Sequence, residues 1–388
     1  MKVTVTKKAE KKLRQGVPLI QKEDIEETIF SNDWVIFQSQ RNEELGRGYL
    51  GKQNKGIGWV LTREKRPIDE DFFAKTFLHA KMKRESFFSC SETTAFRLLN
   101  GEGDALGGLT IDWYDGYVVF SWYNETLYHH NEEILAAFQT AFPEVKGAYE
   151  KIRFASKLEE SRHLYGQRAP EPLLIKENGI TYATYLDDGL MTGIFLDQRE
   201  VRGKLASGFL QGKSILNMFS YTGAFSVAAA KGGAKETTSV DLANRSLERT
   251  REHFQVNDLP LKDQHIYVMD TFDYFKYAKR KEIFYDCIIL DPPSFARNKK
   301  RVFTVAKNYG ELIEQSLAIL SSKGWLIAST NAANLPLDKF EKQIEQAFLK
   351  KGVQLKKQSV FSLPADFATT KFFPEGEYLK VLFYQRID

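Results

Sequence analysis

From about residue 173 to the C-terminus, short apolar runs alternate with segments of helical pattern. Strand-type runs are found at 214–219, 237–240, 266–269, 287–290 and 325–329, with a helix predicted after each. Two further strands, 353–361 and 378–386, are joined by a long loop. Short apolar strands separated by helices are typical of a parallel, doubly wound sheet. The fold class predicted for this part of the chain is therefore α/β.

The first 172 residues follow a different pattern. Up to about residue 70, short alternating or aromatic-rich runs punctuated by Gly and Asn predict a small β-rich barrel or sandwich. Strands at 95–99, 109–113 and 117–123 with helices at 72–82 and 132–142 then predict a small α+β domain, and the polar stretch 156–172 is interpreted as a linker. We therefore expect three domains: 1–70, 71–172 and 173–388.

Composition excludes several classes of protein. The 388 residues are 43% hydrophobic and 27% charged, which is typical of a globular, soluble chain. The two cysteines, Cys90 and Cys287, are too few for a disulfide framework or a four-cysteine zinc site, so we expect no metal. No apolar run reaches the ~18 residues of a membrane span, and residues 1–12 have no apolar signal region. We expect a cytoplasmic protein without a membrane partner.

Positive charge is concentrated in two places, although the net charge is only +4. One cluster lies within the first fifteen residues and the other in the segment 297–301. Either cluster alone is more often a solvated surface, but two of them favour a polyanionic partner such as RNA. The candidate RNA-binding residues are Lys7, Lys8, Lys11, Lys12, Arg14, Arg297, Lys299, Lys300 and Arg301.

Acidic residues follow three successive predicted strands. Asp241, Asp270 and Asp291 stand at the carboxyl ends of these strands, where doubly wound sheets bind ligands. Each acid alone has a second reading as a helix cap. The loop after the first strand, 217–225, has Gly223 but neither a G-x-G-x-x-G pattern nor a phosphate-loop lysine, which disfavours a pyrophosphate cofactor. A nucleoside without pyrophosphate, S-adenosylmethionine, fits this pattern.

The fourth strand runs into a rigid corner, Asp291-Pro292-Pro293-Ser294. Consecutive prolines fix the backbone and remove two N–H donors, so carbonyls are left facing a site. A planar base has room against Phe295. Before the sheet, the stretch 190–199 is dense in groups able to close over a cofactor, and an amphipathic strand and turn is the equally favoured alternative.

Taken together, several stretches resemble one family. T-G-I-F-L-D-Q-R, N-M-F-S-Y-T-G-A-F, S-V-D, D-P-P-S-F, F-P-E-G-E-Y-L-K and L-L-N-G-E-G-D-A-L-G-G-L-T-I-D look like the bacterial 23S rRNA methyltransferases of the RlmI/RlmK type. The resemblance implies an N-terminal PUA RNA-binding domain, a small α+β domain and a C-terminal class I methyltransferase domain with a Rossmann-like sheet. It also implies S-adenosylmethionine as cofactor and 23S rRNA as partner.

Site residues follow from the matching positions. The expected cofactor-binding residues are Phe195, Gln198, Arg199, Asn217, Phe219, Ser220, Tyr221, Thr222, Gly223, Asp241, Asp270 and Asp291. The expected catalytic residues are Asp291, Pro292, Ser294 and Thr330. The oligomeric state is open, with a homodimer among the options.

One departure from the family bears on the chemistry. In the cytosine-5 branch a strand ends in Ser-Cys-Ser, whereas this chain has Thr330 at the place of the cysteine. Carbon 5 of cytosine is a poor nucleophile and the usual route begins with attack by a thiolate, for which threonine is a weak substitute. A ring nitrogen or exocyclic amine needs no covalent intermediate, so the chemistry leans toward direct transfer. The alternative is an RNA-binding protein that keeps the fold without turnover.

Overall fold

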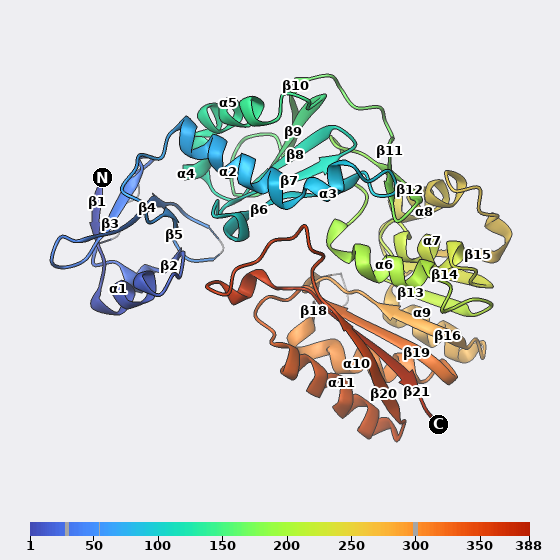
Figure 1. Cartoon of the computed structure of the whole chain (residues 1–388). Helices are drawn as coiled ribbons and strands as arrows, with labels where there is room; N and C mark the ends of the chain where they lie inside the picture. The colour runs from blue at the N-terminus through green and yellow to red at the C-terminus, as the bar shows by residue number, and fades with distance from the viewer. Residues whose placement is uncertain (28–30, 54, 298–301) are drawn as a thin grey trace. The chain divides into compact units, whose positions relative to one another are not determined.

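The computed structural model describes residues 1–27, 31–53, 55–297 and 302–388. The chain forms two compact units. Unit 1 comprises Met1–Ile175, Thr184–Thr192 and Ala365–Gly376, and unit 2 comprises Lys176–Ala183, Gly193–Pro364 and Glu377–Asp388. Each unit contains its own sheets and core, and Figure 1 traces them along the chain.

The N-terminal part of unit 1 is a five-stranded sheet, as its aromatic-rich runs predict. The order is β1-β3-β4-β5-β2, and β3 alternates buried and partly exposed residues. The preceding helix α1 begins after Thr6, whose hydroxyl accepts a hydrogen bond from the backbone N–H of Ala9. The elements are β1 (Lys2–Thr4), α1 (Lys7–Arg14), β2 (Leu19–Ile20), η1 (Lys22–Asp24), β3 (Val35–Gln38), β4 (Glu44–Leu50) and β5 (Gly58–Thr62).

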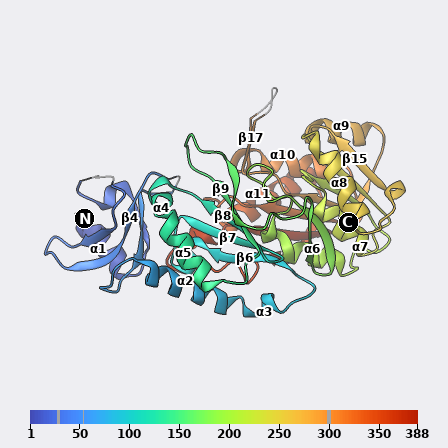
Figure 2. The same ribbon diagram turned by 90° about the horizontal axis from the view of Figure 1, so that it is seen from above.

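A second five-stranded sheet, of order β10-β9-β8-β7-β6, follows in unit 1. The helices α2 and α5 lie beside this sheet (Figure 2). Aromatic side chains of both helices join its core. The elements are α2 (Glu70–Lys83), α3 (Glu85–Phe88), β6 (Ala95–Asn100), η2 (Gly101–Asp104), β7 (Leu109–Tyr114), β8 (Tyr117–Trp122), α4 (Glu125–His129), α5 (Asn131–Ala141), β9 (Gly147–Ile152) and β10 (Ser161–Gly166).

The interpretation of 156–172 as a linker is wrong, because this stretch contains β10. The strand pairs antiparallel with β9, placing Ser161 opposite Lys151. Its polar composition has a physical reason: β10 lies at the edge of the sheet, where polar residues face water and discourage pairing with other chains. After it come β11 (Leu173–Glu177) and β12 (Ile180–Thr184), which pair with each other.

A segment distant in sequence completes unit 1. Residues Ala365–Gly376, here called the strap, lie between the last two strands of the chain but belong to unit 1. Asp366 is fully buried, and its carboxylate accepts a hydrogen bond from the backbone N–H of Arg97 at 2.8 Å. The backbone carbonyl of Asp366 accepts a hydrogen bond from the guanidinium of buried Arg84 at 2.6 Å. Phe373 packs edge-on against Trp59 with ring centroids 5.2 Å apart. The strap therefore supplies part of the core of unit 1.

Unit 2 is built on a seven-stranded sheet of order β15-β14-β13-β16-β19-β21-β20. The five strands from β15 to β19 are parallel, as predicted, whereas β21 runs antiparallel to β19 and β20. The chain leaves β13 toward one edge and returns on its other side with β16, so the switch point lies between these two strands. The strands are β13 (Ser214–Met218), β14 (Glu236–Asp241), β15 (Gln264–Val268), β16 (Tyr285–Leu290), β19 (Leu320–Thr330), β20 (Leu355–Phe361) and β21 (Lys380–Arg386).

Helices cover this sheet. Figure 1 shows α10 and α11 side by side, and both share a core with α9 and the strands. The helical elements of unit 2 are η3 (Leu196–Gln198), α6 (Arg199–Ala206), α7 (Ala224–Lys231), α8 (Arg245–Gln255), η4 (Leu261–Asp263), α9 (Thr271–Arg280), α10 (Val305–Leu317) and α11 (Leu337–Lys351), and β17 (Phe295–Arg297) pairs with β18 (Val302–Thr304). The short η5 (Pro374–Gly376) belongs to the strap of unit 1. Among the described helices, none has the length and apolar character needed to cross a membrane.

Candidate functional site

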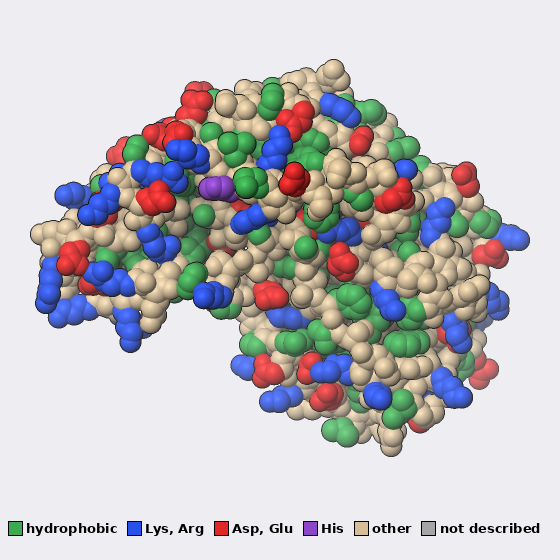
Figure 3. Space-filling model, viewed as in Figure 1, with side chains coloured by type: hydrophobic (Ala, Val, Ile, Leu, Met, Phe, Trp, Pro, Cys, Tyr) green, Lys and Arg blue, Asp and Glu red, His purple; other side chains and the backbone are tan. Residues whose placement is uncertain are grey.

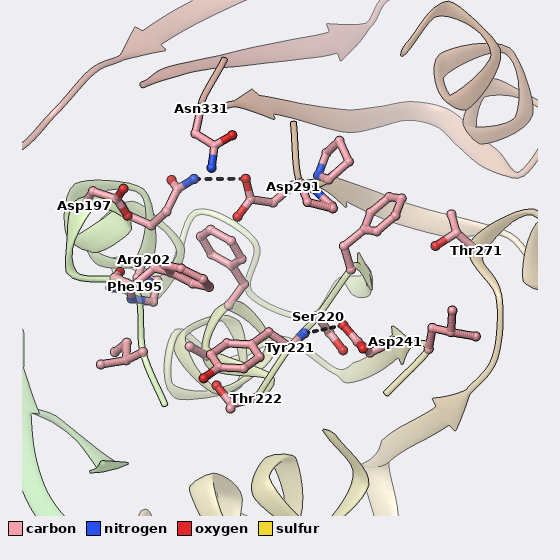
Figure 4. Close-up of a pocket in the computed structure, with 18 of the residues that line it drawn as sticks. Phe195, Asp197, Arg202, Ser220, Tyr221, Thr222, Asp241, Thr271, Asp291 and Asn331 are labelled. Atoms are coloured by element: carbon pink, nitrogen blue, oxygen red, sulfur yellow. Dashed lines mark hydrogen bonds between the residues drawn. The ribbon is translucent and has the colours of Figure 1, made fainter. Parts of the chain in front are cut away.

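A cavity of about 360 Å³ opens at the carboxyl ends of the parallel strands of unit 2 (Figure 4). This volume falls within the range of roughly 300–1,000 Å³ usual for small-molecule sites. Its walls include the loops after β13, β14, β15, β16 and β19 and the segment that leads into α6. The predicted residues that line it are Phe195, Gln198, Phe219, Ser220, Tyr221, Thr222, Asp241, Asp270, Asp291 and Pro292.

The loop between β13 and α7 has an unusual backbone. Phe219, Tyr221 and Gly223 all lie in the left-handed region, with φ of 58°, 51° and 74°. Such conformations cost a residue other than glycine of order 1–3 kcal/mol and are found mainly where function requires them. A Cβ on Gly223 would lie 2.4 Å from Cγ2 of Thr250 in α8, so the glycine permits close helix packing. Gly223 itself is not on the cavity wall.

Asp241 anchors this loop at the end of β14. One carboxylate oxygen accepts the backbone N–H of Tyr221 at 2.8 Å and the other accepts that of Ala243 at 2.9 Å (Figure 4). Each carboxylate oxygen has a second lone pair, so a ligand hydroxyl can still be accepted. Asp270 also faces the cavity, and one of its oxygens caps α9 by accepting the N–H of Phe272 at 2.9 Å. For Asp270 the helix-cap reading is therefore correct.

Asp291 lies at the end of β16 within a buried polar network. The side-chain nitrogen of Gln198 donates to the carboxylate at 3.1 Å and to the hydroxyl of Ser329 at 2.9 Å. Burial raises the pKa of Asp291 to about 6, and the hydrogen bonds from Ser329 and Gln198 offset only part of that rise. A carboxylate held in this way keeps its orientation and can accept a proton or a hydrogen bond.

Arg202 was not singled out from the sequence, yet it lines the cavity. Its guanidinium makes two hydrogen bonds to buried Glu177, at 2.6 and 2.7 Å, and a third to the carbonyl of Phe195 at 2.7 Å. This bidentate pair fixes the segment that carries Phe195 and Gln198. Arg199 was expected at the cofactor, but it is buried and is not among the cavity-lining residues.

Thr330 also lies off the cavity wall. It is fully buried, and its hydroxyl accepts the backbone N–H of Ala332 at 3.2 Å. The next residue, Asn331, lines the cavity instead, and its amide oxygen accepts a 2.6 Å hydrogen bond from Ser294. Asn217 is buried within β13 and donates to Ser226 at 3.0 Å, away from the cavity.

Most of the other lining residues that were not predicted are sequence neighbours of predicted ones, and two come from distant parts of the sequence. Phe303 and Leu379 line the cavity from either side of the last helices, and Asp197 receives a 2.8 Å hydrogen bond from Tyr378. Leu379 lies within the F-P-E-G-E-Y-L-K stretch, which was the available signal for this wall. No local pattern points to Phe303.

The cavity fits a polar nucleoside ligand, as two unsatisfied atoms indicate. The hydroxyl of Ser220 and the amide oxygen of Gln198 are buried on its wall without a partner in the described part of the chain. Buried polar atoms are normally hydrogen-bonded, so each has capacity for a ligand group. Together with Asp241 they suit the ribose and amino-acid groups of S-adenosylmethionine.

The basic residues of α1 are in unit 1. Lys7, Lys8 and Lys11 are exposed, whereas Lys12 pairs with the buried Asp24 at 2.7 Å and Arg14 pairs with Glu10. Lys and Arg side chains gather on the surface around this helix in Figure 3. Of the second predicted cluster, Arg297 lies in β17, and Lys299, Lys300 and Arg301 lie outside the described residues.

The sheet order and the cavity at the switch point define a class I methyltransferase that uses S-adenosylmethionine. Comparison with known proteins agrees. The family described as S-adenosylmethionine-dependent methyltransferase matches residues 97–348, more than half of the chain, and a PUA-like domain family matches residues 3–63. The chain belongs to this S-adenosylmethionine-dependent methyltransferase family.

Several of its relatives match over most or all of their lengths. A Bacillus subtilis protein named "Putative ribosomal RNA large subunit methyltransferase YwbD" is 47% identical over all of both chains. Ribosomal RNA large subunit methyltransferase I of Shewanella amazonensis is 32% identical over 87% of this chain and 86% of that one. The crystal structure of SMU.776 complexed with SAH is 50% identical, covers 99% of this chain and 100% of that chain, and superposes with a TM-score of 0.95.

Proposed function

We propose that this protein transfers the methyl group of S-adenosylmethionine to a base of 23S ribosomal RNA in the cytoplasm. The main support is the likeness over the full length to a Bacillus subtilis protein whose name gives large-subunit ribosomal RNA as its substrate. The cavity at the switch point, with Asp241 and Asp291 on its wall, supports the same reaction.

The residues of the chain have separate parts in this reaction. S-adenosylmethionine supplies an electrophilic methyl group when bound. Asp241 accepts hydrogen bonds from the ribose hydroxyls of the cofactor. The strained loop 219–223 forms the part of the cavity wall that contacts the cofactor. Asp291 and Pro292 orient the base, and the half-exposed Phe195 helps to exclude water. Such positioning converts transfer into an effectively intramolecular step, which is a large source of rate acceleration.

We propose direct transfer to a nitrogen of the base. The route through carbon 5 of a pyrimidine requires a thiolate nucleophile. Thr330 points its hydroxyl at a backbone N–H, and the Cys287 thiol is fully buried in β16, where burial raises its pKa. Neither residue belongs to the cavity wall of the described structure. A nitrogen lone pair aimed at the methyl group needs no such nucleophile.

The test uses 23S rRNA from a strain that lacks this protein. The purified protein, S-adenosylmethionine labelled in the methyl group, and either free rRNA or 50S subunits are incubated, and the labelled nucleosides are separated. We expect label in a nucleoside methylated on nitrogen. Label in 5-methylcytosine would contradict direct transfer, and no label in either substrate would contradict the proposed function.

The remaining parts of the proposal concern the other domains. We propose that residues 1–70, 71–172 and 173–388 act as the PUA-like, middle and methyltransferase domains, and that Lys7, Lys8 and Lys11 contact RNA phosphates. Exposed lysines on one helix suit phosphate contacts, which make binding salt-dependent. A homodimer is one option for the assembly, and analytical ultracentrifugation of the protein with and without RNA measures it.

A further inference from the structure

Asn331 presents a hydrogen-bond donor at the cavity wall. Its amide oxygen is occupied by the hydroxyl of Ser294 at 2.6 Å, which defines the orientation of the amide. The amide nitrogen then points toward Asp291, which lies beside it on the cavity wall (Figure 4). Within the described residues this nitrogen has no acceptor, and Asn331 is exposed to solvent in the structure. An oriented, unused donor at the mouth of a site is available to a ligand.

The backbone that carries Asn331 is fixed on both sides. The N–H of Ala332 donates to Thr330 at 3.2 Å, and its carbonyl accepts from the ammonium group of Lys380 at 3.1 Å. Tyr309 bonds to the carbonyl of Ser329 at 2.8 Å and to that of Leu290 at 3.2 Å, which ties the ends of β19 and β16 together. A rigid support of this kind is what a recognition residue requires.

The geometry pairs this donor with an acceptor. Asp291 and Asn331 extend from neighbouring parallel strands, because Leu290 of β16 is in register with Ala328 of β19. The carboxylate of Asp291 is held by Gln198, and the amide of Asn331 is held by Ser294. One acceptor and one donor side by side match an edge of a nucleobase, where N–H groups alternate with carbonyl or ring-nitrogen acceptors.

We propose that Asn331 is a specificity-determining residue that donates a hydrogen bond to an acceptor atom on the edge of the target base, while Asp291 accepts from a neighbouring N–H. Ser294 is a positioning residue that sets the orientation of the Asn331 amide. This assignment rests on the proposed function. In the cytosine-5 branch the residue at the position of Thr330 is a nucleophilic cysteine. In this chain the next residue, Asn331, would instead recognise the base.

The test compares two substitutions at this site with a matched control. Asn331→Ala removes the donor, and Asn331→Asp replaces it with an acceptor of nearly equal size. Asn334→Ala is the control, because Asn334 is an exposed residue of the same loop that does not line the cavity. For each variant, calorimetry measures the Kd of S-adenosylhomocysteine and thermal unfolding measures Tm. The kcat/KM is measured from the transfer of labelled methyl groups to 23S rRNA from the strain that lacks this protein.

We expect Asn331→Ala to lower kcat/KM for RNA by about tenfold to a hundredfold, the usual range for a lost contact to a base edge. Asn331→Asp should lower it further, because the carboxylate repels both the base acceptor and Asp291. The Kd of S-adenosylhomocysteine and Tm should stay close to those of the unsubstituted protein and of Asn334→Ala.

Three outcomes would overturn the assignment, and they are distinguishable. Unchanged kcat/KM in Asn331→Ala would mean that the base does not contact this amide. A parallel loss of S-adenosylhomocysteine affinity would make Asn331 a cofactor-binding residue. Transfer to RNA absent even with the unsubstituted protein would overturn the proposed function itself, and the assignment with it.

Discussion

Gly223→Ala offers a quantitative test of the packing behind the cofactor loop. Gly223 has φ of +74°, and an added Cβ would lie 2.4 Å from Cγ2 and 3.0 Å from Oγ1 of Thr250. A left-handed conformation costs a residue with a Cβ roughly 1–2 kcal/mol. Overpacking a close helix contact costs a further 1–3 kcal/mol or so. We expect the free energy of unfolding to fall by about 2–5 kcal/mol.

Two further variants separate these contributions. Gly212 has a similar φ of +71° but no atom within 4 Å of its added Cβ. Gly212→Ala should therefore cost only the conformational part, roughly 1–2 kcal/mol. In the Gly223→Ala variant, a second substitution Thr250→Ala removes the two nearest atoms and should restore about 1–3 kcal/mol. The Thr250 hydroxyl is buried without a partner in the described structure, so no hydrogen bond is lost with it.

The assay is urea unfolding with and without S-adenosylhomocysteine, so that the transition shifted by the ligand is assigned to unit 2. Because the chain forms two compact units, it need not unfold in a single two-state transition. The transition of unit 2 is therefore compared among the unsubstituted protein, Gly223→Ala, Gly212→Ala and the double variant. Thr250→Ala alone is measured as the reference for the double variant. The reasoning is refuted if Gly223→Ala costs no more than Gly212→Ala, or if Thr250→Ala restores nothing.

Three further predictions follow from the site and from α1. Because the pKa of Asp291 is raised to about 6 from an ordinary 3.8, the protonated group stabilises the folded state at low pH. The free energy of unfolding of the unsubstituted protein, relative to that of Asp291→Asn, should therefore fall between about pH 4 and 6 and level off above pH 6. If urea titrations show that this difference in free energy does not change with pH, the burial argument is contradicted. Thr330→Ala should lose the hydrogen bond to Ala332 and one buried methyl group, together about 1–3 kcal/mol of stability, and keep methyl transfer. Complete loss of transfer with normal folding would restore Thr330 as a catalytic residue. Replacing Lys7, Lys8 and Lys11 by Gln should reduce the slope of log K for RNA binding against log salt concentration by about 2–3. The control Lys12→Gln should act mainly on stability, because Lys12 pairs with buried Asp24. An unchanged slope in filter binding would remove α1 from the RNA interface.

The sheet of unit 2 was predictable because its signal is local. Each parallel strand is a short apolar run, and Asp241 and Asp291 follow their strands directly, so the end of a strand in sequence is also a wall of the cavity. The departure at Thr330 was also visible in the sequence. That its hydroxyl turns inward while Asn331 faces the cavity depends on backbone direction after β19, which the residue types do not encode locally.

The missed features depend on partners far apart in the chain. In the sequence, Arg202 looks like any other arginine of a helix. Its role depends on Glu177, twenty-five residues earlier, which fixes its guanidinium. The edge strand β10 resembles a linker because an edge needs polar residues and little apolar alternation. The strap was expected to be a long loop between two strands, and the burial of its Asp366 depends on Arg84 and Arg97.

The strap has a consequence for synthesis of the protein on the ribosome. Domains usually fold in the order in which they emerge, at roughly 5–20 residues per second. Unit 1 is nearly complete at Thr192, but its last part, the strap, begins at Ala365. That interval corresponds to a wait of about 10–35 seconds during translation. Until then Arg84 and Trp59 lack their strap partners, so a nascent chain stalled before residue 365 should expose a surface open to chaperones.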